Sequence, residues 1–186
     1  MRKTPFDPIF YMREALKEAD LAQKIGEVPI GAVVVDQDGS IIGRGHNRRE
    51  TDSDVSSHAE LNAIKDAAKT INTWRLDDCT VYVTLEPCFM CASAIMQARV
   101  KHLSFAAKDP KAGAVESLTK FYELYPQNHE VSWDSGLLAD EASQLLKSFF
   151  KSLRQRNKRD NKAYGGRGKR AIAASERLLE KPGDPE

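Results

Sequence analysis

The sequence predicts an α/β fold, a three-layer α/β/α sandwich in which helices cover both faces of a mixed sheet of about five strands. Amphipathic helical patterns alternate with short apolar runs along the body of the chain. Two early apolar runs flank Asp38-Gly39, a tight-turn pair that is typical of an antiparallel hairpin. The later runs alternate with helical patterns, which favours parallel strands joined by crossover helices.

Local signals set the order of elements in the first half of the chain. Asp7-Pro8 is a typical helix-start pair, and apolar residues follow at helical spacing until Gly26. The elements predicted next are the strands 31–36 and 41–45, a polar loop as far as Ser57 and a helix over 58–69.

The second half continues the alternation of strand and helix. Pro87 suits the first turn of a helix, and the last helical pattern carries one apolar face. The predicted elements are a strand 80–85, a helix from 87 to about 99, a strand 100–106, a weaker fifth strand near 130–133 and a helix from 137 to about 155.

Composition and charge exclude several classes of protein. The 186 residues are 41% hydrophobic and 30% charged, and 28 Lys or Arg against 27 Asp or Glu leave a net charge of +1. This mixture excludes a wholly disordered chain and a fibre. The chain lacks the run of about 18 to 20 apolar residues that a membrane span needs, and its first ten residues lack the apolar core of a secretion signal. We therefore expect a cytoplasmic protein.

The charge is concentrated near the C-terminus. Residues 151–170 contain nine Lys or Arg and one acidic residue, Asp160, which gives a local charge of +8. Beyond about residue 157 the sequence loses its large apolar residues. We therefore predict a folded domain over 5–157 and a basic, disordered tail over 158–186. The tail either attracts phosphate groups or is simply solvated, and the sequence leaves both interpretations open.

Two cysteines three residues apart indicate metal or redox chemistry. Cys88 and Cys91 follow Pro87 at a predicted helix start, where residues three apart project from the same face. The positive end of a helix favours the thiolate, which is the form that binds zinc. Two buried thiols or a redox pair would explain the same spacing.

His58 and Glu60 favour a catalytic zinc site. Residues two apart can serve one site at the first turn of a helix, where we place them. Two thiolates and one neutral imidazole balance the charge of Zn²⁺ and fill three tetrahedral positions, which leaves the fourth for water. Glu60 can then accept a proton from that water and deliver it elsewhere.

A closed structural zinc site is the alternative interpretation. In such a site Glu60 would be an exposed carboxylate at a helix start, and a fourth protein ligand would complete the tetrahedral coordination of the metal ion. The candidate fourth ligands are Cys79, His46, His102 and His129. Cys79 begins a strand pattern, which favours a small buried hydrophobic residue.

These motifs resemble a known family. His58-Ala59-Glu60 followed by Pro87-Cys88-x-x-Cys91 is the known signature of zinc-dependent nucleobase deaminases. Further motifs over roughly residues 5 to 155 resemble the bacterial tRNA-specific adenosine deaminases. These motifs are Val28-Pro29-Ile30-Gly31, Gly45-His46-Asn47, Trp74-Arg75-Leu76, Thr84-Leu85-Glu86, Asp109-x-Lys111-x-Gly113-Ala114, Asn128-His129 and Phe149-Phe150.

The resemblance implies a cytidine deaminase-like fold and a homodimeric hydrolase with one Zn²⁺ per subunit. It implies that His58, Cys88 and Cys91 bind the zinc and that Glu60 transfers protons. The implied substrate is the wobble adenosine in the anticodon stem-loop of a tRNA, which is converted to inosine with release of ammonia.

The resemblance also implies contacts with the substrate. Asn47 would form hydrogen bonds with the base edge, although an Asn after a strand is also a common turn residue. Asp109 and Lys111 would hold the ribose and backbone, or they belong to a solvated loop. Phe149 would stack on a flanking base, while one of Phe149 and Phe150 belongs to the core because neighbours on a helix face different directions.

Two other functions share the zinc residues. A deaminase of free guanine or cytosine bases or nucleosides would also use Glu60. The basic residues of 151–170 and the predicted helix that carries Phe149-Phe150 argue against this function. A non-catalytic, zinc-stabilised RNA-binding subunit would be marked by a lost carboxylate, whereas Glu60 is present. One departure from the family is Glu116, which adds a negative charge close to the loop expected to meet RNA.

Overall fold

A computed structural model describes residues 7–124 and 128–163 of the chain. The helices and strands follow the predicted order, with one addition, a short helix inside the predicted polar loop. The elements are α1 (Pro8–Lys24), β1 (Gly31–Val35), β2 (Ile41–His46), α2 (Arg49–Asp52), α3 (Ala59–Ile71), β3 (Thr80–Leu85), α4 (Phe89–Gln97), β4 (His102–Ala107), β5 (Ser132–Ser135) and α5 (Ala139–Ala163).

The five strands form one mixed sheet in the order β2-β1-β3-β4-β5. Strand β1 is antiparallel to both of its neighbours, whereas β3, β4 and β5 are parallel to one another. Every residue of β1 is buried, as its unbroken apolar sequence requires in a central strand. The prediction of a mixed sheet with a hairpin followed by parallel strands is confirmed.

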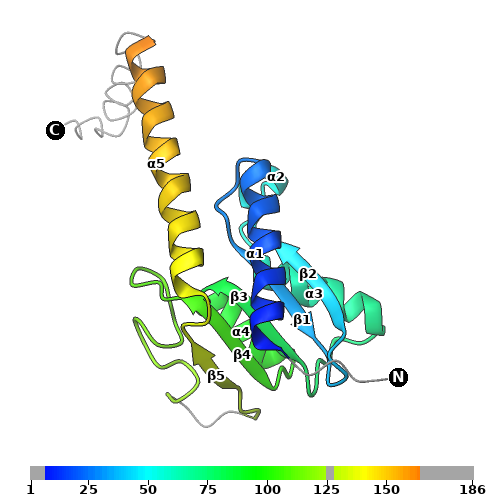
Figure 1. Cartoon of the computed structure of the whole chain (residues 1–186). Coiled ribbons are helices and arrows are strands. Elements are labelled where there is room, and N and C mark those ends of the chain that lie inside the picture. Colours follow the sequence, from blue (N-terminus) through cyan, green and yellow to red (C-terminus); the bar gives the residue numbers. More distant parts are fainter. Residues whose placement is uncertain (1–6, 125–127, 164–186) are drawn as a thin grey trace, which may run out of the picture. The chain divides into compact units, whose positions relative to one another are not determined.

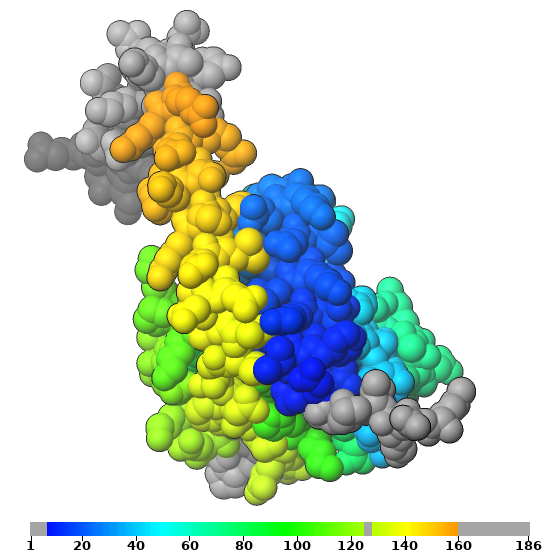
Figure 2. All heavy atoms as spheres, viewed as in Figure 1, coloured from blue at the N-terminus to red at the C-terminus, as the bar shows by residue number. Residues whose placement is uncertain are grey.

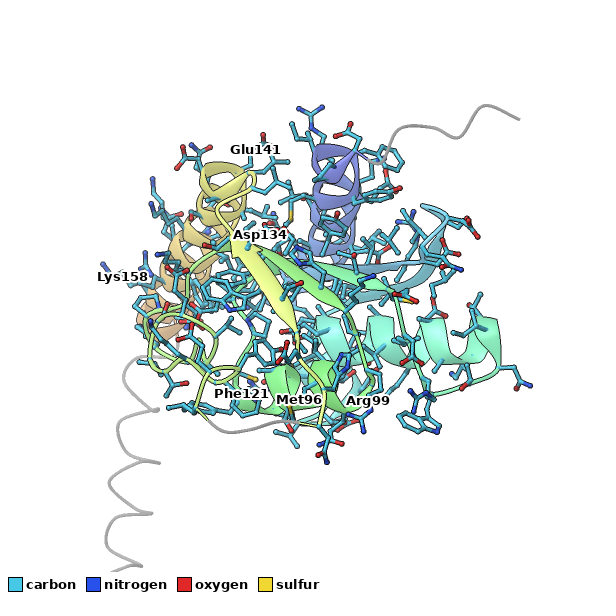
Figure 3. The ribbon with its side chains drawn as sticks, turned by 90° about the horizontal axis from the view of Figure 1, so that it is seen from below. Met96, Arg99, Phe121, Asp134, Glu141 and Lys158 are labelled. Atoms are coloured by element: carbon cyan, nitrogen blue, oxygen red, sulfur yellow. The ribbon has the colours of Figure 1, made fainter. Side chains whose placement is uncertain are left out.

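Helices cover both faces of the sheet, as Figures 1 and 3 show. Helix α1 and the first turn of α5 pack on one face, around Met12, Tyr82 and Ala142. Helices α3 and α4 pack on the other face, around Ala63, Ile95 and other small or branched side chains. Figure 2 shows the face that α1, in blue, covers. The predicted three-layer α/β/α sandwich is confirmed.

Capping explains where the first helix begins and ends. The Asp7 carboxylate accepts a hydrogen bond of 3.0 Å from the amide of Ile9, and Pro8 occupies the first helical turn. After the helix ends, Gly26 adopts a φ of +84°, which glycine tolerates better than other residues. The sequence signals at both ends of α1 therefore act as predicted.

The last two elements differ from their predicted bounds. Strand β5 covers Ser132–Ser135, about two residues later than expected. Helix α5 continues to Ala163 rather than ending near Gln155. Arg and Lys favour helix strongly, and the next glycine is Gly165, so a loss of apolar residues does not by itself end the helix.

The chain separates into two compact units, Met1–Leu146 and Lys147–Glu186, so α5 begins in the first and ends in the second. The predicted domain boundary at residues 157 and 158 stays a prediction, and most of the predicted tail lies outside the described residues. None of the described helices has the length and apolar composition of a membrane span.

Candidate active site

The starts of helices α3 and α4 bring together the three predicted metal ligands. His58 is the N-cap residue of α3, and Cys88 is the N-cap residue of α4, with Cys91 in the first turn that follows. Both helices therefore direct their positive ends toward this group, which favours thiolates over thiols. A search of the described residues for three or more His, Cys, Asp or Glu side chains close enough to share a metal ion finds these three.

The spacing of the donor atoms fits a tetrahedral metal. Nδ1 of His58 lies 3.8 Å from Sγ of Cys88 and 3.5 Å from Sγ of Cys91. Zinc–nitrogen and zinc–sulfur bonds of the usual lengths, at a tetrahedral angle, separate such a pair of atoms by about 3.6 Å. The donor set could therefore bind zinc without a large movement of the backbone.

The two thiols of this group differ in acidity. A hydrogen bond from Cys91 lowers the pKa of Cys88 to about 4, while burial opposes this shift and His58 supports it. The pKa of Cys91 is raised because its thiol donates to Cys88 and because it is buried. The hydrogen bond to Cys88 also raises the pKa of His58. A metal ion that binds these three atoms would displace the protons that they share.

Glu60 lies in the first turn of α3, and only 4% of the residue is exposed. Burial raises its pKa, while its own amide and the charge of His58 act in the opposite direction. Cys88 and Cys91 also act on this carboxyl group, which places it beside the predicted ligands. The alternative in which Glu60 is an exposed carboxylate is therefore wrong.

The candidate fourth ligands lie elsewhere. The ring of His46 contacts Glu18 at 3.0 Å, and the ring of His129 contacts the carbonyl oxygen of Val100 at 2.6 Å. His102 is held between the side chains of Ser132 and Asp134. Cys79 is 3% exposed, and burial raises its pKa to about 11, as expected for a small buried residue. In the part of the chain that the structure describes, the three-residue group thus has no fourth protein ligand.

Asn47 is buried at the end of β2, and a second buried carboxylate fixes its side chain. Its amide nitrogen donates to Glu27 at 3.1 Å, and the backbone amide of Thr51 donates to the same carboxylate at 2.7 Å. Asn47 is 5% exposed and Glu27 is 2% exposed. Sequence reasoning missed Glu27, because its partners Asn47 and Thr51 lie 20 and 24 residues away along the chain.

The side chain of Asn62 connects the end of β2, next to Asn47, to the start of α3. Its side-chain amide donates to the carbonyl oxygen of His46 at 3.0 Å and to the hydroxyl of Ser57 at 3.1 Å. The end of β2 and the residue before His58 are therefore held by one side chain. This contact was not predicted, because Asn62 follows a helical pattern and carries no separate sequence signal.

The loop with Asp109 and Lys111 passes beside the cysteine motif, residues 87–91. Gly113 forms an isolated β-bridge with Cys88, and the amide of Ala114 donates to the carbonyl oxygen of Pro87 at 2.9 Å. Within the loop, the Asp109 carboxylate accepts hydrogen bonds from the amides of residues 111 and 112 at 2.9 and 3.3 Å. Lys111 itself is exposed.

Glu116 and Phe149 each contact a nearby side chain. Glu116 forms an ion pair with Lys108, which offsets the extra negative charge expected there. Phe149 packs edge to face against Phe150, with ring centroids 5.5 Å apart. Both phenylalanines belong to the second compact unit, so the predicted contact of Phe149 with substrate stays a prediction.

Comparisons with known proteins agree with this geometry. A family model described as MafB19-like deaminase matches residues 6–154. The chain is 48% identical over 147 residues to the tRNA-specific adenosine deaminase of Haemophilus influenzae, a match that covers 79% of this chain and 85% of that protein. It is 47% identical over 148 residues to the protein of the same name from Bacillus subtilis, with 80% and 91% covered.

Two solved structures of deaminases share the fold of this chain. One from a study of A-to-I editing by tRNA:A34 deaminases at the wobble position of transfer RNA has a TM-score of 0.71 and 43% identity, and covers 74% of this chain and 99% of that chain. The guanine deaminase from Nitrosomonas europaea has a TM-score of 0.65 and 25% identity, with 77% and 84% covered. The chain therefore belongs to the MafB19-like deaminase family, in the branch of the tRNA-specific adenosine deaminases.

Proposed function

We infer that the chain is a tRNA-specific adenosine deaminase, which hydrolyses the wobble adenosine of a tRNA anticodon to inosine and releases ammonia. The convergence of His58, Cys88 and Cys91 beside the buried Glu60 carries this inference. Curated relatives that are 43% to 48% identical to the chain are named tRNA-specific adenosine deaminases.

We propose that the three donors hold one zinc ion per subunit. Two sulfur atoms and one imidazole nitrogen are a donor set that zinc favours, and their spacing fits its tetrahedral geometry. When bound, zinc would act as a Lewis acid that makes water acidic enough to lose a proton near neutral pH. An open fourth position is consistent with the distant placement of the other histidines and Cys79 in the described chain.

Glu60 is the group that moves protons in this proposal. The reaction forms a bond between water oxygen and C6 of adenine and breaks the bond between C6 and the amino nitrogen. One proton must move from the water to the ring, and another must reach the departing amine. The Glu60 carboxyl lies beside the ligands and can accept and return each proton, so it ends the cycle unchanged.

Asn47, Asp109, Lys111 and Phe149 are the proposed substrate contacts. Glu27 binds the amide nitrogen of Asn47, so the amide oxygen points away from Glu27 and can accept from a base edge. Asp109 and Lys111 would contact the ribose and backbone from the loop beside Cys88. Phe149 would stack on a base next to the target nucleotide.

A basic stripe on α5 supports RNA as the substrate. Lys147, Lys151, Arg154 and Lys158 recur at intervals of four, three and four residues, so they share one face of the helix, and all four are exposed. The sequence from 147 to 159 contains no acidic residue. Such a stripe is suited to binding the phosphate backbone of RNA.

We also propose that the enzyme works as a homodimer in the cytoplasm, where its tRNA substrate is available. Light scattering of the zinc-loaded protein after size-exclusion chromatography tests the dimer. A mass near twice 20.8 kDa is expected, and a monomer that is fully active would contradict it.

A comparison of substrates tests the function. The wild-type protein is incubated with an anticodon stem-loop that has adenosine at the wobble position, with the same stem-loop carrying guanosine there, and with free adenosine, cytidine and guanine. Separation of the nucleosides should show inosine from the first substrate and little turnover of the others. The fold shared with a guanine deaminase makes guanine the main competitor, and preferential turnover of guanine would replace this proposal. A protein that binds zinc and RNA without any turnover would be a non-catalytic subunit.

A further inference from the structure

A buried carboxylate, Glu86, lies between β3 and the cysteine motif and is 3% exposed. Its Oε1 atom accepts hydrogen bonds from the amides of Val115, Glu116 and Ser117 at 3.1, 2.7 and 2.9 Å. Its Oε2 atom accepts from the amide of Asp109 at 3.0 Å and from the Ser117 hydroxyl. Both ends of one loop, residues 109–117, are therefore fastened to a single side chain.

The middle of the 109–117 loop also packs tightly on Glu86. A Cβ atom added to Gly113 would lie 2.3 Å from both Cδ and Oε2 of Glu86, so a side chain larger than hydrogen does not fit there. The bridge between Gly113 and Cys88 continues this contact to the start of α4. The loop is thus held at its ends by Glu86 and at its centre by the cysteine motif.

The hydrogen bonds on Glu86 require a carboxylate rather than an amide. Oε1 accepts from three backbone amides and Oε2 accepts from one amide and one hydroxyl, so every partner of Glu86 is a donor. A carboxylate offers two acceptor oxygens, whereas a glutamine side chain would direct an NH₂ group toward donors on one side. Donors that lose a buried partner are costly, because they cannot turn to water instead.

We propose that Glu86 is a positioning residue for the tRNA substrate, which holds the 109–117 loop in the shape that presents Asp109 and Lys111. It fixes the Asp109 backbone directly, and the Asp109 carboxylate in turn accepts from the amide of Lys111. This proposal rests on the proposed function, because it assumes that the loop meets RNA.

Three variants separate positioning from general destabilisation. Glu86→Gln keeps the size of the side chain but leaves one acceptor oxygen, so either the Asp109 amide and the Ser117 hydroxyl or the amides of residues 115–117 lose their acceptor. Ser117→Ala removes one hydroxyl donor and leaves the backbone hydrogen bonds in place. The matched control is Glu14→Gln, which alters another buried carboxylate, 8% exposed, on α1 at the opposite face of the sheet.

The experiment measures binding, kinetics and loop protection in the zinc-loaded protein. Affinity for the anticodon stem-loop is measured in a Glu60→Ala background, where turnover should be slower by a factor of about 10² to 10⁴. Glu86→Gln should raise Kd about tenfold, since it removes hydrogen bonds to a charged acceptor. In the otherwise wild-type protein KM should rise more than kcat falls, and amide hydrogen exchange at residues 109 and 115–117 should accelerate. Ser117→Ala should show a smaller increase in Kd, of about twofold to fivefold, and Glu14→Gln should leave Kd unchanged.

Several results would overturn the proposal. Faster exchange in the loop with unchanged Kd would mean that the loop does not present RNA contacts. Loss of zinc from Glu86→Gln with unchanged Kd would place its role at Cys88 instead. Ser117→Ala decides the matter if Glu86→Gln does not fold, and an unchanged Kd in Ser117→Ala then counts against positioning. Failure of the proposed function is distinguishable, because the wild-type protein would then neither bind nor deaminate the stem-loop.

Discussion

At the scale of single residues, the proposed chemistry depends on side chains whose places are set by helix starts. His58 and Cys88 cap α3 and α4, and Glu60 and Cys91 lie within the first turns that follow. The sequence predicted these four residues because short spacings on helices leave few possible geometries. It could not predict Glu27 or Glu86 as anchors, because each acts on backbone amides more than twenty residues away.

Variants of Glu60 and Cys88 should separate proton transfer from metal binding. Glu60→Ala should retain one zinc per chain and lose activity by a factor of about 10² to 10⁴, the usual contribution of general acid–base catalysis. Cys88→Ser should lose the metal and the activity together. Zinc content by mass spectrometry and inosine formation in the stem-loop check both variants. An active Glu60→Ala protein would remove Glu60 from the mechanism.

Glu27 should influence catalysis through Asn47. In Glu27→Gln, one of the two donors, the Asn47 amide or the Thr51 backbone amide, would face an NH₂ group instead of an oxygen. We expect kcat/KM for the stem-loop to fall about tenfold while zinc content stays constant, because a hydrogen bond to a charged group is removed. Unchanged steady-state kinetics in a folded, zinc-loaded variant would show that the orientation of Asn47 does not matter.

At the scale of elements, the place of the site depends on how closely α3 approaches β2. A Cβ atom at Gly45 would lie 2.3 Å from the backbone nitrogen of Ala63 and 2.4 Å from the carbonyl oxygen of Ala59. Ala59 directly follows His58, so Gly45→Ala should displace the first turn of α3. We expect a loss of about 1 to 3 kcal/mol in stability and weaker zinc binding.

Gly43→Ala is the control for this prediction. Its Cβ atom would meet the same helix at comparable distances, near Ala63 and Ala67, farther from the ligands. Chemical denaturation and competition with a zinc chelator should show that both variants are destabilised but that Gly45→Ala loses more zinc affinity. Equal zinc affinities would contradict the role given to the first turn.

The link between α1 and β2 should depend on pH through Glu14. Its hydrogen bond to Lys17 lowers its pKa below the ordinary value of 4.5, against the effect of burial and together with Arg44. A lowered pKa adds stability above the pKa of the unfolded chain, and this stability is lost as the pH falls through the folded value. Glu14→Gln should therefore be less stable than the wild type by about 1 to 3 kcal/mol at pH 7. Denaturation at pH 7 and pH 3.5 should show the difference shrinking in acid, and a constant difference would contradict this.

Elements with strong local patterns were predictable, and those set by side-chain contacts were not. The Asp38-Gly39 turn and the buried run of β1 gave the hairpin, and the capping pair Asp7-Pro8 gave the start of α1. Helix α2 arises in the predicted polar loop, where Arg48 binds Asp52 and Thr51 donates to Glu27. Such contacts form after the chain has folded and leave no periodic pattern in the sequence.

At the scale of the whole molecule, the basic C-terminal residues should add affinity for RNA without setting specificity. A chain that ends at Asn157 removes six Lys or Arg between 158 and 170. We expect unchanged zinc content and thermal stability and a weaker dependence of Kd on salt, with the slope falling by about 0.7 for each phosphate group that the shorter chain no longer neutralises. Titrations of the stem-loop between about 50 and 200 mM salt measure this slope. An identical slope would mean that this segment is only solvated, and unfolding would refute the predicted boundary at residue 157.

The deaminase account as a whole requires a zinc ion held by His58, Cys88 and Cys91 with one position left open. X-ray absorption spectroscopy at the zinc edge, on the purified wild-type protein, tests this most directly. We expect one zinc per chain with two sulfur neighbours and one imidazole among the remaining light-atom neighbours. A third sulfur, a second imidazole or the absence of zinc in active protein would contradict it.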